Sequence, residues 1–464
     1  MNFSTSLRMS ATAVALIGMC VTGVQAESLK AALTAAYAHN PTITSALYSV
    51  KVASENIALR KSALRPNLGV SASISDTFGT DGHVFANGQT AQTGLAYNQT
   101  LFDNHKTDAD VEQARALVEV ANQSLRGTEA SVMLSVVQAY MNIILNTQLV
   151  TLTTDTQQFY QSQVKAAQDR QNIGEGTKID VAQAQAAYAN AVAARESAVA
   201  ALQSAQASYA HWVGHKAHNL SSDFNYGTLI PTSVDRAVSL AGKLNPTVLA
   251  ARASIRAAEA GADSAAAGFG PTVGLSGAVG PTFSTPGSSG SSGVQLGGTV
   301  KLSLSVPLYA GGALGAAQRQ ANLSTIKSNL DAQAALDQAT EQVVTAWSSL
   351  QNAAAQIESA KSAVDAGQLA LDGVIQERDV GQKTTLDVLN AEATLTTSKE
   401  ALIGASANRV LAAFNLIAAT GRLTARDLAL RTSTKSAAAY TAKVEDTWEE
   451  LHTLEPLPRP AWRR

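Results

Sequence analysis

The chain contains 464 residues, of which 45% are hydrophobic and 15% are charged, with one cysteine and a formal net charge of −2. The charged fraction lies below the roughly 25% of ordinary soluble proteins. The nearly balanced charge offers no basic surface for a nucleic acid, and one thiol cannot build a disulfide framework. After the N-terminal residues we find no run of about 18 consecutive apolar residues, so a bundle of membrane-spanning helices is not predicted.

Residues 1–26 have the three parts of a secretory signal peptide. Arg8 supplies the positive charge, Ala11 to Val21 are mostly apolar, and Val24-Gln25-Ala26 form a small-residue cleavage site. An uncleaved anchor is the alternative, but the apolar part is short for a membrane span. Because the single cysteine, Cys20, lies inside this segment, the exported mature chain is expected to contain no cysteine.

The sequence repeats itself at a nearly constant separation, which predicts a tandem duplication. The corresponding positions are Asn40-Pro41-Thr42 and Asn245-Pro246-Thr247, Pro66 and Pro271, Leu101-Phe102 and Leu308-Tyr309, Gly174 and Gly381, Asp180-Val181 and Asp387-Val388, and Gly214 and Gly421. The first repeat covers residues 27–220 and the second covers 221–430. The remaining tail, 431–464, is expected to be mobile or wrapped around the middle of the molecule.

Each repeat is predicted to begin with a helix followed by a pair of strands. In the first repeat, a helical stretch from about residue 29 to 65 ends before Pro66, and residues 67–102 form the strand pair around a Gly-rich turn, Gly79 to Gly88. Apolar residues alternate with small polar ones at Leu68, Val70, Ala72 and Ile74, and again at Leu95, Tyr97 and Leu101.

The second repeat shows the strand pair more clearly, over residues 272–308. Apolar positions alternate at Val300, Leu302, Leu304, Val306 and Leu308. The connection from Pro281 to Gly298 is rich in Gly and Ser. It could be a flexible linker, but alternating segments on both sides favour a long hairpin loop.

Two long helices complete each repeat, over 105–172 and 177–213 in the first and 312–380 and 384–420 in the second. The longer member of each pair is predicted to be a rod of roughly 100 Å. The shorter member has apolar residues at heptad spacing, which predicts antiparallel coiled-coil packing against the rod. The helices near 29–65 and 177–213, if they stacked end to end, would together have about the length of one rod.

Four strands with alternating polarity suit a membrane β-barrel, but they are too few to close one. Open strand edges cannot face lipid, so the strands must be pooled among several chains. Three chains would give twelve strands, the smallest barrel from this chain expected to leave a pore. Aromatic residues near the predicted strand ends, where membrane-interface girdles belong, are Phe78, Tyr97, Phe102, Phe269, Phe283 and Tyr309.

The duplicated plan resembles the TolC family of outer-membrane efflux and type I secretion channels, over roughly residues 27–430. The most specific segment is VGQKTTLDVLNA, from Val380 to Ala391, with a weaker echo from Ile173 to Ala184. The resemblance implies an α+β membrane protein. Three tandem-duplicated protomers would share a twelve-stranded outer-membrane β-barrel continuous with a long periplasmic α-helical barrel, closed at a coiled-coil tip.

The resemblance also implies partners and a task. The homotrimer, embedded in outer-membrane lipid, would dock a periplasmic adaptor (membrane fusion) protein and an inner-membrane pump of the RND or ABC type. It would conduct small toxic compounds or drugs, type I secreted proteins, or both, passively and without a cofactor. The helix-to-helix turns at Gly174 and Gly381, with Thr177 and Thr384, are the expected tip and adaptor contact.

The resemblance further assigns a gate to this tip. Asp387 would line the narrowest point, where a threefold ring of carboxylates favours cations and raises their pKa. Asn390 replaces a second acidic residue of the family, which weakens the ring. Arg378 is hypothesised to pair with Asp180, and Lys383 to tie protomers together or to use Asp180. The alternative is that these charges only cap exposed helix turns.

Other chemistry is poorly supported. The spacing of His211, His215 and His218 could hold a metal, but no matching carboxylate or thiol accompanies them, so surface histidines are the better interpretation. No catalytic motif was found, which makes an enzyme a distant possibility. The competing hypothesis is a trimeric cell-surface coiled-coil protein with an adhesive or structural role and no pore. Two widely separated strand pairs argue against it.

Overall fold

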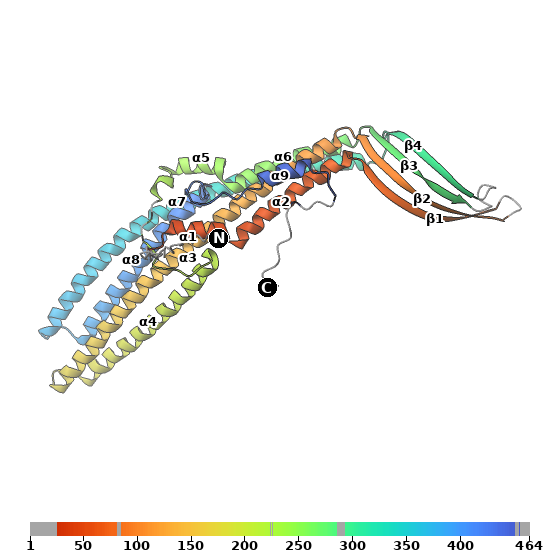
Figure 1. Cartoon of the computed structure of the whole chain (residues 1–464). Helices are drawn as coiled ribbons and strands as arrows, with labels where there is room; N and C mark the ends of the chain where they lie inside the picture. The colour runs from red at the N-terminus through yellow and green to blue at the C-terminus, as the bar shows by residue number, and fades with distance from the viewer. Residues whose placement is uncertain are drawn as a thin grey trace, which may run out of the picture.

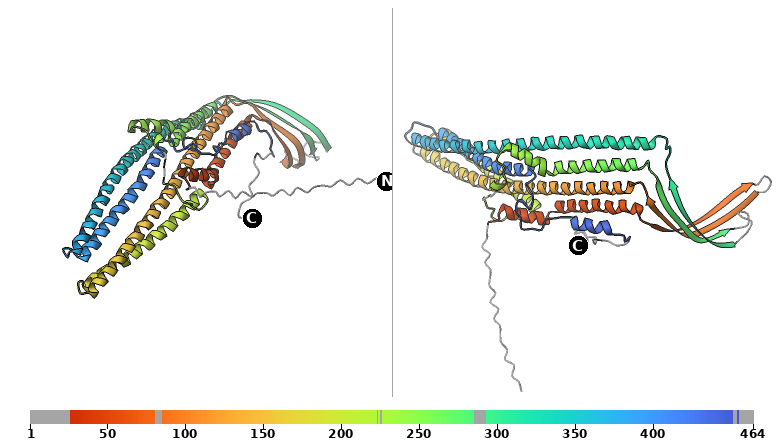
Figure 2. Two further views of the ribbon diagram at one scale, coloured as in Figure 1. Left: turned by 60° about the vertical axis from the view of Figure 1, so that its left-hand side comes forward. Right: turned by 90° about the horizontal axis from the view of Figure 1, so that it is seen from above.

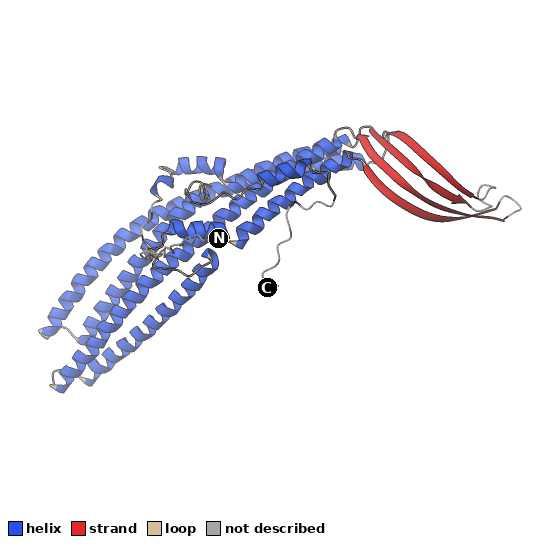
Figure 3. Cartoon of the chain, in the orientation of Figure 1, coloured by secondary structure: helices blue, strands red, loops and turns tan. Residues whose placement is uncertain are grey.

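The computed structural model describes residues 26–80, 85–222, 224, 226–284, 293–450 and 454. The expected signal peptide therefore lies outside the described residues, apart from Ala26. The molecule is elongated, with a helical stem that carries one small sheet at its end (Figures 1 and 3).

Four helices form the two hairpins of the stem. α3 (Lys106–Asn172) and α7 (Ala313–Asp379) are each 67 residues long, which corresponds to roughly 100 Å. α4 (Lys178–Val213) packs along α3, and α8 (Thr385–Ala419) packs along α7. These bounds lie within one residue of the expected ranges.

The helix expected over 29–65 is broken into two, contrary to the prediction. α1 (Leu29–His39) ends at Asn40, whose backbone is extended (φ −65°, ψ 125°), and α2 (Pro41–Lys61) begins with the proline. A residue before proline avoids the helical conformation, and proline is suited to the first helical position. A short 3₁₀ turn, η1 (Ser62–Leu64), then leads to the sheet.

The second repeat has the same break, between α5 (Val234–Leu244) and α6 (Pro246–Ala267), which follow the 3₁₀ turn η2 (Gly227–Leu229). The side-chain amide of Asn245 donates to the Ala419 carbonyl at the end of α8, at 2.9 Å. In the first repeat, Asn40 reaches the Trp212 carbonyl near the end of α4 in the same way, at 3.3 Å. Asn40 therefore links the start of α2 to the end of α4, and Asn245 links the start of α6 to the end of α8. Each link lies beside the long helix of its repeat.

The sheet contains β1 (Asn67–Thr80), β2 (Phe85–Phe102), β3 (Thr272–Ser284) and β4 (Gly293–Ser305), all antiparallel and in this order. The β2–β3 pairing joins the two repeats. The hairpins extend further than expected, because Gly88 pairs with Thr77 and Pro281 pairs with Leu296. Strands pair through backbone hydrogen bonds, which do not require alternating side chains. Parts of the Gly-rich segments that were predicted as loops therefore belong to the strands.

The core lies in the middle of the stem, where α1 packs against α3 and α4. Its largest completely buried side chains include Tyr37, Met133, Tyr140 and Tyr209. α3 and α8 are long and apolar enough to cross a membrane by composition, but about half of the relevant segment of each is already buried inside the protomer. We therefore interpret both as core helices of the stem.

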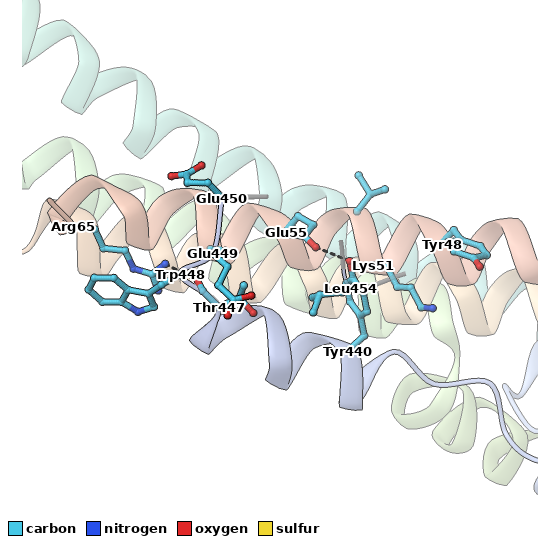
Figure 4. Close-up of a pocket in the computed structure, with 12 residues that line it drawn as sticks. Tyr48, Lys51, Glu55, Arg65, Tyr440, Thr447, Trp448, Glu449, Glu450 and Leu454 are labelled. Atoms are coloured by element: carbon cyan, nitrogen blue, oxygen red, sulfur yellow. Dashed lines mark hydrogen bonds between the residues drawn. The ribbon is translucent and has the colours of Figure 1, made fainter. Parts of the chain in front are cut away.

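The described part of the tail is packed on the stem, which corresponds to the wrapped alternative of the two expected for it. α9 (Ala438–Asp446) lies against α2. The Tyr440 hydroxyl donates to Glu55 at 2.5 Å, and Arg65 donates to the Thr447 carbonyl at 2.8 Å and stacks over Trp448 (Figure 4). A cavity of about 570 Å³ lies between the two segments.

Candidate functional site: a two-faced sheet and the stem tip

The register of the sheet collects its apolar side chains on one face. Leu68 lies opposite Tyr97, and Leu275 lies opposite Leu302. The large apolar residues on this face include Leu68, Val70, Ile74, Phe78, Leu95, Tyr97, Val273, Leu275, Val279, Phe283, Val294, Leu296, Val300, Leu302 and Leu304. Several are almost fully exposed in the protomer, including Ile74 at 84% and Val300 at 85%. A continuous exposed apolar face of this kind needs a lipid or protein cover.

The height of the apolar face matches the apolar part of an outer membrane. The apolar positions of β4 run from Val294 to Leu304, which is roughly 33 Å at about 3.3 Å per residue. A strand tilt of about 40° reduces this length to roughly 25 Å, the height of the apolar band of outer-membrane barrels. The sheet is therefore long enough to span the bilayer.

The other face of the sheet is polar and built from small residues. The polar side chains on it include Ser71, Ser73, Ser75, Thr77, Thr90, Gln92, Asn98, Ser276, Thr282, Gln295, Thr299, Lys301 and Ser303. Alternation of an apolar outer face with a polar inner face is the pattern of a barrel that encloses water.

The six aromatic residues expected at the membrane interfaces fall into two groups. Phe78 and Phe283 lie near the far end of the sheet and are exposed. The other four lie near the stem: Tyr97, Phe102, Phe269 and Tyr309. Tyr97 is half-buried opposite Leu68, whereas the other three are exposed, and the Phe102 ring meets His105 edge-on.

The sheet and the upper stem have the same two lateral borders. β1 and β4 are the edge strands of the sheet. In the stem, contacts place the helices in the order α2, α3, α6, α7, and α9 packs against α2, so that α7 forms one border and α2 with α9 forms the other (Figure 2, right). Because α2 leads into β1 and β4 leads into α7, each border is continuous from the stem to the sheet.

Both helical borders carry exposed apolar rows at helical spacing. The row on α2 consists of Tyr48, Val52 and Leu59, and the row on α7 consists of Leu323, Ile326 and Leu330. Residues three, four or seven apart share one face of a helix. The protomer therefore exposes apolar surface along the same two borders where its strands are unpaired.

At the opposite end of the stem, the turn between α3 and α4 is closed by local hydrogen bonds. Gly174 has φ +83°, a left-handed conformation that glycine adopts without a Cβ clash. Thr177 caps α4: its hydroxyl accepts from the Asp180 N–H at 3.2 Å. The Asp180 carboxylate accepts from the Thr177 N–H at 3.0 Å and from its hydroxyl at 2.6 Å. This reciprocal arrangement is a capping box.

The turn between α7 and α8 repeats this geometry. Gly381 has φ +79°. The Thr384 hydroxyl accepts from the Asp387 N–H at 3.2 Å, and the Asp387 carboxylate accepts from the N–H and hydroxyl of Thr384, both at 2.8 Å. The two turns therefore have equivalent caps, Thr177 with Asp180 and Thr384 with Asp387.

Hydrogen bonding lowers the pKa of both tip carboxyl groups. Bonds from Thr384 hold the pKa of Asp387 below its usual value, with a smaller contribution from the charge of Lys383. Bonds from Thr177 do the same for the pKa of Asp180, assisted by the charge of Arg170. Within one protomer, both aspartates therefore act as the helix-capping charges named above as the alternative. Asn390 is exposed one turn further along α8.

Arg378 does not pair with Asp180 within the protomer, contrary to the hypothesis. Its guanidinium donates to Gln163 on α3 at 2.8 Å and to the adjacent Asp379 at 2.9 Å. Arg170 at the end of α3 also reaches Asp379, at 3.4 Å. Within the protomer, the neighbouring carboxylate of Asp379 is the acidic partner of Arg378. These contacts connect the ends of the two long helices.

The tip also exposes aliphatic side chains that the sequence interpretation missed. Ile173 and Val380 immediately precede the two turn glycines and are 70% and 71% exposed. Ile179 and Leu386, each one residue before a capping aspartate, are also exposed. Their equivalent positions in the two repeats are a signal that could have identified them.

His211 and His215 contact different neighbours. His211 lies against Trp212, and the His215 ring is 3.4 Å from the Glu27 carboxylate. In the part of the chain that the structure describes, no group of three potential metal ligands is found.

These features define a class of protein: a duplicated protomer that combines a membrane-spanning, two-faced sheet with a periplasmic helical stem. The sequence profile of the outer membrane efflux protein family matches residues 32–215 and 237–422, one match for each repeat. The chain belongs to this family. It is an outer-membrane channel protein that forms the exit duct of an export system, and the family is one of channels. The pore-free adhesive alternative is not favoured.

Individual relatives agree with this assignment. The chain is 33% identical to the outer membrane efflux protein BepC of Brucella suis over 97% of this chain and 98% of the relative. It is 27% identical to the outer membrane protein TolC of Escherichia coli, over 89% and 87% of the two chains. Its fold is similar to the outer membrane protein VceC of Vibrio cholerae, with a TM-score of 0.71, 21% identity and coverage of 85% and 96%.

Proposed function

We propose that three copies of this chain close into one continuous duct. β1 of one protomer would pair with β4 of the next, so that twelve strands enclose water and present the apolar face to lipid. A head-to-tail contact between different edges closes into a ring when the rotation fits. The observation that carries the proposal is the continuity of each lateral border, because one rotation satisfies the open strands and the apolar helix rows together.

The helix rows supply the contact in the stem. The row on α7, with Ile326 at its centre, would pack against the row on α2 of the next protomer. Burying apolar area at roughly 25 cal/mol per Å² would favour this assembly. The helical stems of three protomers, closed in this way, would form a periplasmic barrel whose lumen continues that of the β-barrel.

The stem tip is proposed as the gate. Threefold assembly would bring three copies of Asp387 and Asn390 around the axis, with Asp180, Arg378 and Lys383 in the surrounding tip. The contacts of Arg378 with Gln163 and of Arg170 with Asp379 support a tip held closed by polar links between the hairpins. Opening would require these contacts to break and to be replaced by others when a pump complex binds.

The two turns are proposed as the adaptor contact. Gly174 and Gly381 expose backbone beside Ile173 and Val380, and Thr177 and Thr384 are exposed nearby. A periplasmic adaptor with apolar side chains at its own tip fits such a surface. An inner-membrane pump of the RND or ABC type would then supply the energy. A relative named alkaline protease secretion protein AprF, 24% identical over 65% of this chain, supports proteins as cargo. The efflux protein BepC supports small toxic compounds.

The assembly is tested with the full mature chain in detergent. Ile326→Asp places a charge in the apolar row of α7, and Ser324→Asp adds the same charge at an exposed position nearby. We expect the parent and Ser324→Asp to sediment as trimers and to conduct in planar bilayers, whereas Ile326→Asp should lose most of its trimer. A conducting monomer, or a trimer unaffected by Ile326→Asp, would reject the proposal.

A further inference from the structure

The polar face of the sheet is almost free of charge. Among the described residues of the four strands, Lys301 on β4 is the one charged side chain on that face. The one acidic side chain of these strand segments, Asp76, has the opposite parity and lies on the apolar face, where Gln89 donates to it at 3.4 Å. The lysine charge therefore has no counter-charge on its own face of the sheet.

Lys301 lies in the half of the sheet that is nearer the stem. It pairs with Ser276 on β3, which in turn lies opposite Asn98 on β2. Asn98 lies opposite Asn67, the first residue of β1. This row of four residues crosses the sheet just above the junction with the helices, and Lys301 is exposed within it.

We propose that Lys301 determines the charge preference of the barrel. This inference rests on the proposed trimer, in which three lysines would form a ring of ammonium groups on the wall of the lumen. Rings of Lys or Arg favour anions in pores. The neighbouring Ser, Thr, Asn and Gly residues provide no charge that would cancel the ring. Small anionic compounds, such as carboxylates, sulfonates and phosphate esters, are the cargo class that the ring favours.

The ring would act in series with the acidic tip. Three carboxylates of Asp387 at the gate attract cations, whereas three ammonium groups near the barrel entrance attract anions. Fields from exposed charges are screened over a Debye length of about 8 Å at physiological ionic strength, but of about 30 Å at 0.01 M. The effect of Lys301 on ions in a wide lumen should therefore be large at low salt and small at high salt.

The test measures reversal potentials of the purified full-length trimer in planar bilayers under a KCl gradient. The background is Asp387→Asn with Arg378→Ala, which reduces the contribution of the tip. In this background, Lys301→Gln should lower the chloride-to-potassium permeability ratio several-fold at low salt, and Lys301→Glu should lower it further. Lys301→Arg should keep the parent ratio, and Thr299→Gln, a neutral change on the same face, should also leave it unaltered.

The outcomes separate the two proposals. Trimers that conduct with the same permeability ratio in Lys301→Gln, Lys301→Glu and the parent at low salt would overturn the role of Lys301 and leave the duct intact. A chain that forms no conducting trimer would overturn the proposed function itself. A ratio that changes equally with Thr299→Gln would also reject a specific role for Lys301, because the effect would then follow lumen geometry.

Discussion

Asp387 is held by the residue that starts its own helix, Thr384, and not by a basic side chain. Its carboxylate accepts two hydrogen bonds of 2.8 Å from Thr384, and its backbone N–H returns one of 3.2 Å to the Thr384 hydroxyl. Asp180 and Thr177 are related in the same way. The charge proposed for the gate is therefore positioned by the first turn of α8, so that gate and helix start are coupled.

Thr384→Ala should loosen this first turn. The substitution removes the hydroxyl that caps the Asp387 N–H, and loss of such a cap costs about 1 kcal/mol. Amide exchange at residues 385–388 should accelerate accordingly. Thr397→Ala removes a hydroxyl in the interior of the same helix and should leave these amides unchanged. Equal protection of the first turn in Thr384→Ala and the parent would contradict the assignment of the cap.

Asp387→Asn should weaken inhibition of conductance by multivalent cations. In the proposed trimer it removes three carboxylates from the constriction, and such rings attract cations. The measurement is the dose response of single-channel conductance to a trivalent cation. Asp372→Asn, which removes an exposed carboxylate from α7, serves as the control. If both variants were inhibited like the parent, Asp387 would not belong to the constriction.

Arg378→Ala combined with Lys383→Ala should raise single-channel conductance. The first change removes the link between α7 and Gln163 of α3, and the second removes the positive charge beside Asp387. Lys361→Ala, on the exposed middle of α7, should have the conductance of the parent. A correctly assembled double variant with unaltered conductance would reject the gate at this position.

Acid should loosen the tip. Because hydrogen bonds lower the folded-state pKa of Asp180 and Asp387, each carboxylate stabilises the folded tip above its unfolded pKa of about 3.9. This stabilisation is lost as the pH falls through the lower folded-state pKa. Single-channel conductance should therefore rise as the pH falls below about 4, whereas a Thr177→Ala, Thr384→Ala double variant, which already lacks the caps, should respond less. A parent channel that stays closed throughout this range would contradict the predicted link between protonation of the aspartates and opening of the tip.

Tyr37→Phe should destabilise the attachment of the tail. The Tyr37 hydroxyl donates to the buried Glu129 carboxylate at 2.9 Å and accepts from the Lys435 N–H at 2.9 Å. Burial raises the pKa of Glu129, and the tyrosine hydrogen bond opposes this effect. Leaving such a group without its partner costs about 1–3 kcal/mol. Thermal unfolding should shift downwards, whereas Tyr48→Phe at a half-exposed ring should not change it.

The sequence alone determined the periodic and repeated parts of this protein. The duplication, the four long helices and their ends at Gly174 and Gly381 follow from local signals, because a helix ends where glycine adopts a positive φ. The alternation of apolar and polar residues along the strands could also be recognised, since it depends only on neighbours along the chain. The need to pool strands followed from the hydrogen-bonding demands of the backbone in lipid.

The tertiary structure decided which of these parts meet. The pairing of β2 with β3, the packing of the tail on α2 and the choice of Asp379 over Asp180 by Arg378 are contacts between distant or competing residues, which periodicity does not encode. The break at Asn40 is an intermediate case: Pro41 signals it, because the residue before a proline avoids the helical conformation, but the predicted helix runs through this position. Local rules fix the type of most elements and the length of the long helices, whereas partners are fixed by burial and by hydrogen bonds that form only after the elements have assembled.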